Sequence, residues 1–229
     1  MTNTEPNVLK NNNLKIYTIP GLGFDERIFE KIDFGQNRVG HLNWIVPERD
    51  ESLGSYAKRM AATMEKTKER VVLVGHSFGG VMAQEIARFV DIEKIILVSS
   101  IKSSDENPWH IRMIEPLGFS RLFTKTLTLG TFRIWAKRHG YSTGVEQQLF
   151  RSMIGKQSDD YLKWAIKALS RWAGPNGITT PVVHIHGDHD KTFPVQLIKH
   201  PFHLVNGGSH FMVFNQPDIV GKMILKAMD

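Results

Sequence analysis

One serine stands in a setting that favours nucleophilic chemistry. Ser77 is the centre of Gly75–Gly79, which reads GHSFG, follows the apolar run 71–74 and precedes a helix-forming stretch at 80–87. A GxSxG turn between a buried strand and a helix holds its serine in a strained conformation, and its glycines let strand and helix pass closely. The free N–H groups at the helix start stabilise an oxyanion. This context favours a nucleophile over a serine that only caps a helix.

A serine nucleophile needs a general base and a carboxylate that holds the base in the right tautomer. The apolar run 181–187 leads into Asp188 and Asp190, and a later short strand runs through glycines to His210. Functional groups collect at the carboxyl ends of parallel strands, and the chain order serine, acid, histidine is the one expected after a GxSxG turn. The predicted catalytic set is Ser77, one of these aspartates and His210.

These motifs resemble the α/β-hydrolase family, and they do so over nearly the whole chain. In that family the acid follows the pattern HGxxD after a strand, which Asp190 matches, and the histidine lies on a loop after the last strand, where His210 is found. The first loop of the family usually reads HGxG, and here Pro20–Gly23 has proline in place of the histidine. The resemblance implies that the backbone N–H groups of Leu22 and Phe78 form the oxyanion hole, and backbone donors survive changes of side chain.

The acid has three candidates. Motif spacing favours Asp190, while Asp188 reaches the imidazole if the loop turns differently. Asp105 lies in a polar loop beyond the strand expected at 94–99 and ranks last.

A zinc-binding pattern competes with the serine site. Residues 184–189 read HIHGDH, which fits the HxHxDH ligand spacing of metallo-β-lactamase-like hydrolases, and strand alternation puts His184 and His186 on one face. Only 40 residues follow His189, too few for the further ligands of that family, and the metal hypothesis leaves Ser77 unexplained. We therefore expect two ordinary strand histidines, an exposed His189, and no metal or organic cofactor. His76 is expected to pack beside the nucleophile without taking part.

Composition is typical of one globular enzyme. The chain has 229 residues, 41% of them hydrophobic, and no cysteine, which is typical of one α/β domain with an insertion and excludes thiolate chemistry. No apolar stretch approaches the roughly 20 residues that span a bilayer, and the polar start at 1–13 lacks an apolar signal core. We expect a cytoplasmic protein without a membrane partner. There is no GxGxxG or Walker A motif, so nucleotide binding is not expected.

Apolar runs alternating with helical patterns indicate a mostly parallel sheet with helices on both faces, the α/β-hydrolase fold. A helix should follow Ser52, and another should open at Pro217. Three parts are expected: a polar tail at 1–13, a core at 14–100 and 176–229, and a helical cap inserted at 101–175. The strands are expected at 14–19, 42–46, 71–75, 94–99, 182–187 and 202–206.

The interval 101–175 is rich in aromatic and basic residues. Most of its large apolar side chains should form a small satellite core, and some should line an apolar acyl or aryl pocket over Ser77. The interval has twelve Lys and Arg against six Asp and Glu. A solvated helix face is the favoured explanation, and steering of an anionic substrate, such as an acyl thioester with a phosphorylated carrier, is the alternative. No module accompanies the charge, so nucleic-acid binding is not expected. The large apolar residues are Trp109, Met113, Phe119, Phe123, Phe132, Trp135, Phe150, Met153, Trp164 and Trp172.

Together the residues predict a serine esterase or thioesterase that cleaves a small carboxylic ester or thioester through an acyl-enzyme intermediate. His210 takes the proton from Ser77 and returns it to the leaving group, and Asp190 orients His210. One alternative is a non-catalytic ligand-binding protein of the same fold. Others, ranked below it, are a carbon-carbon bond hydrolase, a perhydrolase and a metallohydrolase.

Overall fold

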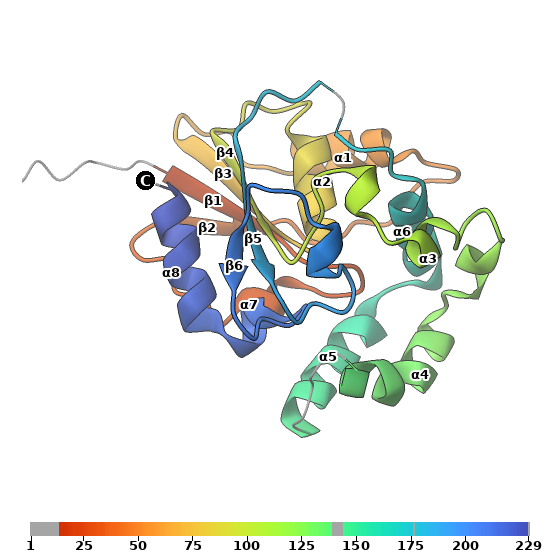
Figure 1. Cartoon of the computed structure of the whole chain (residues 1–229). Coiled ribbons are helices and arrows are strands. Elements are labelled where there is room, and N and C mark those ends of the chain that lie inside the picture. The colour runs from red at the N-terminus through yellow and green to blue at the C-terminus, as the bar shows by residue number, and fades with distance from the viewer. Residues whose placement is uncertain (1–13, 139–143, 176, 229) are drawn as a thin grey trace, which may run out of the picture.

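A parallel sheet of six strands forms the centre of the molecule (Figure 1). The computed structural model describes residues 14–138, 144–175 and 177–228, so the predicted polar tail at 1–13 lies outside the described residues. The strand order is β2-β1-β3-β4-β5-β6, and all five neighbouring pairs are parallel. The strands are β1 (Leu14–Ile19), β2 (Arg38–His41), β3 (Arg70–His76), β4 (Lys94–Val98), β5 (Val182–Gly187) and β6 (His203–Val205).

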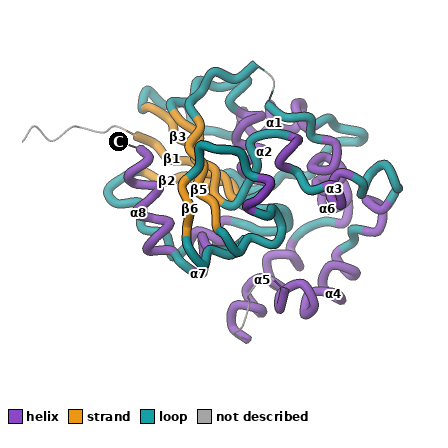
Figure 2. The backbone as a smooth tube through the Cα atoms, viewed as in Figure 1, coloured by secondary structure: helices purple, strands orange, loops and turns teal. Residues whose placement is uncertain are grey.

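Helices connect and cover the strands (Figure 2). Ser52 caps α1 as expected, because its side chain accepts a hydrogen bond from the Ser55 N–H, and α8 opens at Pro217. The α-helices are α1 (Leu53–Ala62), α2 (Phe78–Ile86), α3 (Trp109–Arg112), α4 (Lys125–Arg138), α5 (Gly144–Lys156), α6 (Asp159–Arg171), α7 (Met212–Asn215) and α8 (Pro217–Met228). Short 3-10 turns lie at Glu26–Phe29, Ser104–Glu106, Phe119–Leu122 and Val195–Leu197.

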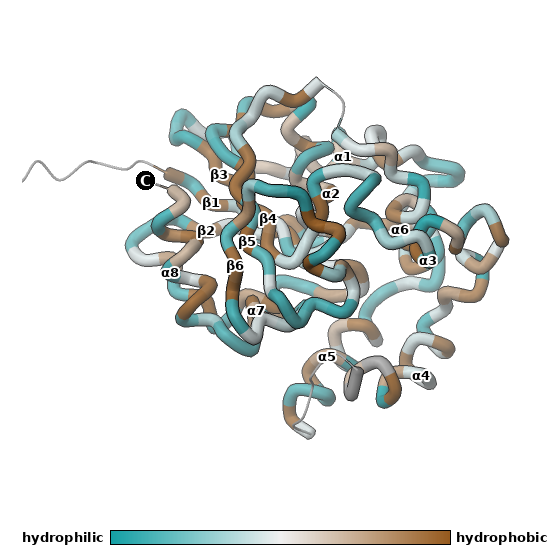
Figure 3. Tube along the Cα trace, in the orientation of Figure 1, coloured by the Kyte–Doolittle hydropathy of each residue, from teal (hydrophilic) through white to brown (hydrophobic). Residues whose placement is uncertain are grey.

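Each face of the sheet carries its own apolar core. Side chains alternate along a strand, so Leu73 points into one cluster with α1, α2 and α6, while Val72 points into the other with α7 and α8. Residues 71–74 of β3 and 95–98 of β4 are consequently all apolar, and brown segments lie in this part of the sheet (Figure 3). Helices thus cover both faces, as predicted.

The expected strand at 42–46 is wrong. The second strand is β2, which pairs with β1 through Lys15 opposite Arg38 and lies at the edge of the sheet. Its residues are half-buried or exposed, so they carry no apolar alternation by which the sequence could reveal them. Residues 42–46 are apolar for another reason, since Leu42, Trp44 and Ile45 pack as a loop against the core. The other strands were placed correctly to within one residue at each end.

The interval between β4 and β5 is helical. Tyr161, Leu162 and Ala165 of α6 join the cluster under α1 and α2, whereas α4 and α5 contribute Phe132 and Phe150 to the opposite cluster. Figure 1 shows α4 and α5 extending beyond the sheet. The division into a cap at 101–175 and a core at 14–100 and 176–229 is a proposal that we retain. Within the described residues, none of the helices has the length and apolar character needed to cross a membrane.

Candidate active site

Ser77 occupies a strained turn between β3 and α2. Its φ of 54° and ψ of −123° place a non-glycine residue in a region that L residues rarely adopt. Hydrogen bonds on both sides hold it there. The Ser77 N–H donates to the Val98 carbonyl at 3.0 Å, and the Ser100 hydroxyl donates to the Ser77 carbonyl at 2.6 Å. Nothing in the sequence indicated that Ser100 contacts Ser77.

Glycines allow the close packing around this turn. A Cβ atom on Gly75 would lie 2.5 Å from the Gly79 carbonyl oxygen, and one on Gly79 would lie 2.5 Å from the carbonyl oxygen of Pro20. These neighbours are backbone atoms and have no rotamer by which to move away. The motif glycines are therefore required by the approach of β3, α2 and the loop after β1.

The three predicted catalytic side chains meet at the carboxyl edge of the sheet. His210 Nε2 lies 2.9 Å from Ser77 Oγ, and His210 Nδ1 lies 2.8 Å from Asp190 Oδ2. All three residues are buried. With its proton on Nδ1, His210 donates to Asp190 and its Nε2 accepts from the Ser77 hydroxyl. This arrangement can remove a proton from the serine during attack on a carbonyl carbon.

Asp190 is held as an ionised acceptor. Its Oδ1 accepts the N–H groups of Thr192 at 2.8 Å and Phe193 at 2.9 Å, while Oδ2 faces His210. Burial alone would raise the pKa of Asp190, but the charge of His210 and these hydrogen bonds outweigh it, so the pKa is lowered. The carboxylate can therefore orient the imidazole and stabilise its protonated form.

The two other acid candidates lie elsewhere. The Asp188 carboxylate forms a hydrogen bond with Nδ1 of the neighbouring His189 at 2.7 Å, and that histidine is exposed. Asp105 is exposed and pairs with Lys199 at 2.7 Å. Of the three aspartates, the structure brings only Asp190 to His210.

The strand histidines bond to protein atoms. His184 Nε2 lies 3.1 Å from His186 Nδ1, and His186 Nε2 lies 2.8 Å from the Phe193 carbonyl oxygen. Burial lowers the pKa of both imidazoles. In the part of the chain that the structure describes, no three His, Asp or Glu side chains are arranged to hold a metal ion.

His76 contacts the backbone of His210, which the sequence did not indicate. It is fully buried, and its Nε2 lies 2.9 Å from the carbonyl oxygen of His210. A carbonyl only accepts, so this nitrogen carries a proton and donates it. Burial and the charge of His210 lower the pKa of His76 to about 3. Its position before Ser77 was the only signal in the sequence, and the contact needs the fold to form.

The expected oxyanion donors flank Ser77. A Cβ atom on Gly21 would lie 3.2 Å from Ser77 Cβ, so the loop carrying Leu22 packs against the turn. Phe78 is the first residue of α2, where an N–H has no partner within the helix. Among the described residues, the Leu22 N–H has no hydrogen-bond acceptor either. The Leu22 and Phe78 amides thus remain the candidates for an oxyanion hole beside Ser77.

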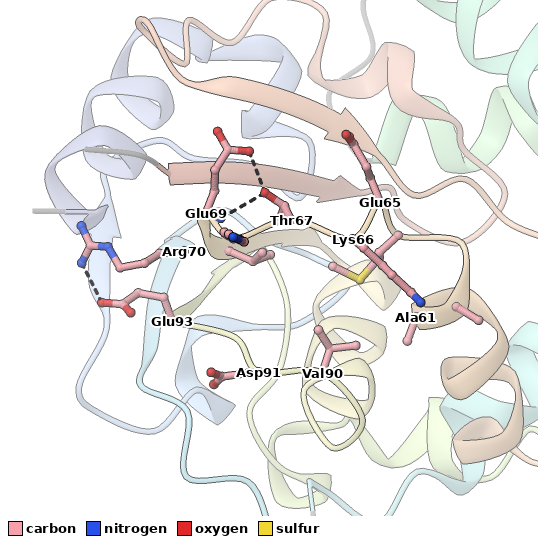
Figure 4. A pocket seen from close by; sticks show the side chains of 13 residues that line it. Ala61, Glu65, Lys66, Thr67, Glu69, Arg70, Val90, Asp91 and Glu93 are labelled. Atoms are coloured by element: carbon pink, nitrogen blue, oxygen red, sulfur yellow. Dashed lines mark hydrogen bonds and ion pairs between the residues drawn. The ribbon is translucent and has the colours of Figure 1, made fainter. Parts of the chain in front are cut away.

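Two cavities lie away from the triad. One of about 520 Å³ is lined by Arg70, Val71 and Glu93 at the amino ends of β3 and β4, opposite the edge that holds Ser77 (Figure 4). Another of about 950 Å³ lies between residues 47–54 and α6. Neither lining includes a triad residue, so neither is the expected acyl pocket.

The large apolar residues of the interval 101–175 differ in how deeply they are buried. Trp164 and Trp172 are buried and line the larger cavity, and Phe132, Phe150 and Met153 belong to the core opposite α1 and α2. Phe123 is half-buried and packs against the cluster under α1 and α2, and Trp109, Met113 and Phe119 are exposed. The side chain of Trp135 lies outside the described residues.

Comparison with known structures supports the fold. The chain is similar to an esterase from Exiguobacterium antarcticum (TM-score 0.71, 14% identity, covering 94% of this chain and 91% of the other). It is equally similar to MenH from S. aureus (TM-score 0.71, 20% identity, 94% and 93%). An epoxide hydrolase from Bacillus megaterium is also similar (TM-score 0.66, 13% identity, 93% and 92%). At these identities the likeness establishes the fold and leaves the reaction open. No curated protein sequence matches.

A family model adds evidence from the sequence itself. The model described as "Alpha/beta hydrolase family" matches residues 16–222, nearly the whole described chain. This match and the parallel sheet confirm the predicted fold class. The chain belongs to the α/β-hydrolase family.

Proposed function

We propose that the protein is a serine hydrolase that cleaves a carboxylic ester or thioester through an acyl-enzyme intermediate. One observation carries the proposal: Ser77 Oγ, His210 and Asp190 form a continuous hydrogen-bonded chain with distances of 2.9 and 2.8 Å. A serine that only capped a helix would need neither partner. The Ser77 side chain also makes no capping hydrogen bond to α2.

The reaction follows from this arrangement. Ser77 Oγ attacks the acyl carbon while its proton moves to His210 Nε2, and the Leu22 and Phe78 N–H groups stabilise the negative oxygen. When the tetrahedral intermediate collapses, His210 gives the proton to the leaving alcohol or thiol. Water then attacks the acyl carbon while its proton moves to His210 Nε2. His210 gives this proton to Ser77 Oγ as the acid is released, which restores the free enzyme. Asp190 remains an ionised hydrogen-bond acceptor throughout.

Two lines support an ester or thioester substrate. Solved structures of similar fold include proteins named as esterases, and the site needs no group other than its own side chains and amides for acyl transfer. The thioester alternative rests on the basic excess of residues 101–175. Two of these basic side chains, Lys167 and Arg171, share Glu115 as their ion-pair partner, so their combined charge exceeds that of the carboxylate.

The decisive experiment compares two serine variants. Ser77→Ala should lower hydrolysis of p-nitrophenyl acetate or butyrate by about a thousandfold or more and abolish labelling by a fluorophosphonate probe. Ser55→Ala removes an exposed hydroxyl from α1 and should leave both unchanged. Full activity in Ser77→Ala would end the proposal.

The substrate class needs a separate measurement. A panel of acyl chain lengths, presented both as p-nitrophenyl esters and as coenzyme A thioesters, tests the acyl pocket and the basic surface together. A preference for the thioester that weakens with added salt would favour the anionic substrate. Equal rates at equal chain length would favour a simple esterase.

A further inference from the structure

Trp44 touches the peptide that presents one oxyanion donor. It lies in the loop after β2, and its indole Nε1 donates to the carbonyl oxygen of Gly21 at 3.0 Å. The same oxygen also accepts the Phe24 N–H at 3.1 Å. The motifs of the catalytic set do not include Trp44, and only the fold brings it to this loop.

The Gly21 carbonyl and the Leu22 N–H belong to one peptide unit. Among the described residues the only cis peptide is His200–Pro201, so the Gly21–Leu22 peptide is trans. In a trans peptide the C=O and N–H bonds point in opposite directions within one plane. Holding the carbonyl on one side therefore fixes the direction of the Leu22 N–H on the other. The hydrogen bond from Trp44 to the Gly21 carbonyl therefore restrains that direction.

The indole is itself held from two sides. It stacks on Phe78, with ring centroids 5.3 Å apart and planes inclined by 24°, and its centroid lies 5.4 Å from that of Tyr161 in α6. Phe78 carries the other expected oxyanion donor. The side chain of Trp44 thus contacts both the Gly21–Leu22 peptide and Phe78, and Tyr161 of α6 packs against the same indole.

We propose that Trp44 is a positioning residue for the oxyanion hole, which orients the Leu22 N–H through its hydrogen bond to the Gly21 carbonyl. This inference rests on the proposed function. It also assigns α6 a role in catalysis, because the Tyr161 ring limits where the indole can lie. An unrestrained Gly21–Leu22 peptide could rotate, and the donor would then have to be reoriented during each turnover.

Two replacements separate the N–H from the ring. Trp44→Phe keeps an aromatic ring against Phe78 and Tyr161 but has no donor. Trp44→His loses the benzene portion and keeps an N–H, since His Nε2 occupies the same place in the five-membered ring as Trp Nε1. Trp172→Phe is the matched control, because it removes a buried indole N–H that donates to Glu85 at 2.9 Å, away from the Gly21 loop.

The expected result is a split between kcat and KM. Trp44→Phe should lower kcat for p-nitrophenyl butyrate about tenfold with KM nearly unchanged, as loss of one hydrogen bond felt in the transition state predicts. It should weaken inhibition by phenylboronic acid, whose serine adduct places an oxygen in the oxyanion hole, by a similar factor. Trp44→His should recover most of kcat, although it packs less well, and Trp172→Phe should change kcat by less than about twofold.

The outcomes distinguish this inference from the proposed function. Wild-type kcat in Trp44→Phe, or equal losses in Trp44→Phe and Trp44→His, would overturn the role of Trp44 while Ser77→Ala still abolished activity. Full activity in Ser77→Ala would overturn both. If Trp44→Phe does not fold, replacing the indole by benzothiophene, which has the same shape and no N–H, makes the same comparison.

Discussion

At the scale of single residues, Asp190 and Asp188 differ in burial and in hydrogen-bond partners, and this difference favours Asp190 as the acid. Asp190 is buried, accepts two backbone N–H groups and faces His210, whereas Asp188 points to an exposed histidine. A carboxylate that orients the base must be fixed and ionised, and Asp190 meets both conditions. Its lowered pKa keeps it ionised through mildly acidic pH.

Two amide substitutions test this assignment. Asp190→Asn should lower kcat by about three to four orders of magnitude, because the amide favours the wrong tautomer of His210. Asp188→Asn should change kcat by less than about threefold, since it alters only a hydrogen bond to the exposed His189. Initial rates with p-nitrophenyl butyrate measure both, and a larger loss in Asp188→Asn would reverse the assignment.

The buried His76 predicts how stability depends on pH. Its pKa falls from 6.5 to about 3 on folding, so between these values the unfolded chain binds a proton that the folded protein does not. The contribution of neutral His76 to the free energy of unfolding is therefore complete above pH 6.5. It is lost as the pH falls below 6.5, by about 1.4 kcal/mol per pH unit.

The corresponding measurement is urea unfolding at pH 7 and pH 5. His76→Asn should lose less stability across this interval than the wild type, by about 2 kcal/mol. His184 and His186 contribute a change of the same sign in both proteins, because burial lowers their pKa as well. Equal pH dependence in the two proteins would show that His76 is protonated in the folded state.

At the scale of elements, the turn between β3 and α2 depends on backbone contacts that side chains cannot relieve. Gly79 packs directly on carbonyl oxygens at the end of β1, so β1, β3 and α2 are in contact at one point. Strain at Ser77 is maintained by this packing and by the hydrogen bond from Ser100. Ser77 is thus held by three elements at once.

Alanine at two glycines separates close packing from helix propensity. Gly79→Ala should lower the free energy of unfolding by about 3 kcal/mol, because backbone must move to admit the methyl group. Gly130→Ala in α4 meets nothing within 4 Å and should raise it by about 0.5–1 kcal/mol. Denaturant titrations measure both, and a stable Gly79→Ala would contradict the tight packing at the turn.

At the scale of the whole molecule, the helical interval and the sheet share their cores. Phe150 of α5 packs against Phe24, which lies two residues after Leu22 in the loop that follows β1, with ring centroids 5.4 Å apart. It also packs against Phe211, which follows His210, at 5.5 Å, and against Phe214 at 5.3 Å. One ring therefore joins α5 to two loops of the candidate active site.

This sharing predicts one cooperative unfolding transition. Phe150→Ala should lower the free energy of unfolding by about 3–5 kcal/mol and shift the whole transition to lower temperature without splitting it. Val145→Ala changes an exposed residue of the same helix and should alter stability by less than about 0.5 kcal/mol. Scanning calorimetry tests this, and two separate transitions would show that the interval 101–175 unfolds on its own.

The sequence predicted an element correctly where the pattern that identifies it lies within that element. The buried strands β1, β3, β4 and β5 read as apolar runs, and the cap and first-turn residues of α1 and α8 were legible. The edge strand β2 was misplaced because half-exposed residues are under no apolar constraint, while the apolar residues of 42–46 lie in a loop beyond its end. The roles of Ser77, Asp190 and His210 remain predictions, although the structure brings these residues together.

By itself, the sequence determined the family, the parallel sheet and a short list of residues able to do acyl chemistry, because strand periodicity and the GxSxG turn are local patterns. Only the tertiary structure decided which aspartate faces His210, that His76 holds the backbone of His210, and that Trp44 fixes the Gly21 carbonyl. Each of these contacts joins residues at least 20 positions apart. The geometry of such contacts is set by how strands and loops converge at the sheet edge, and no local pattern encodes it.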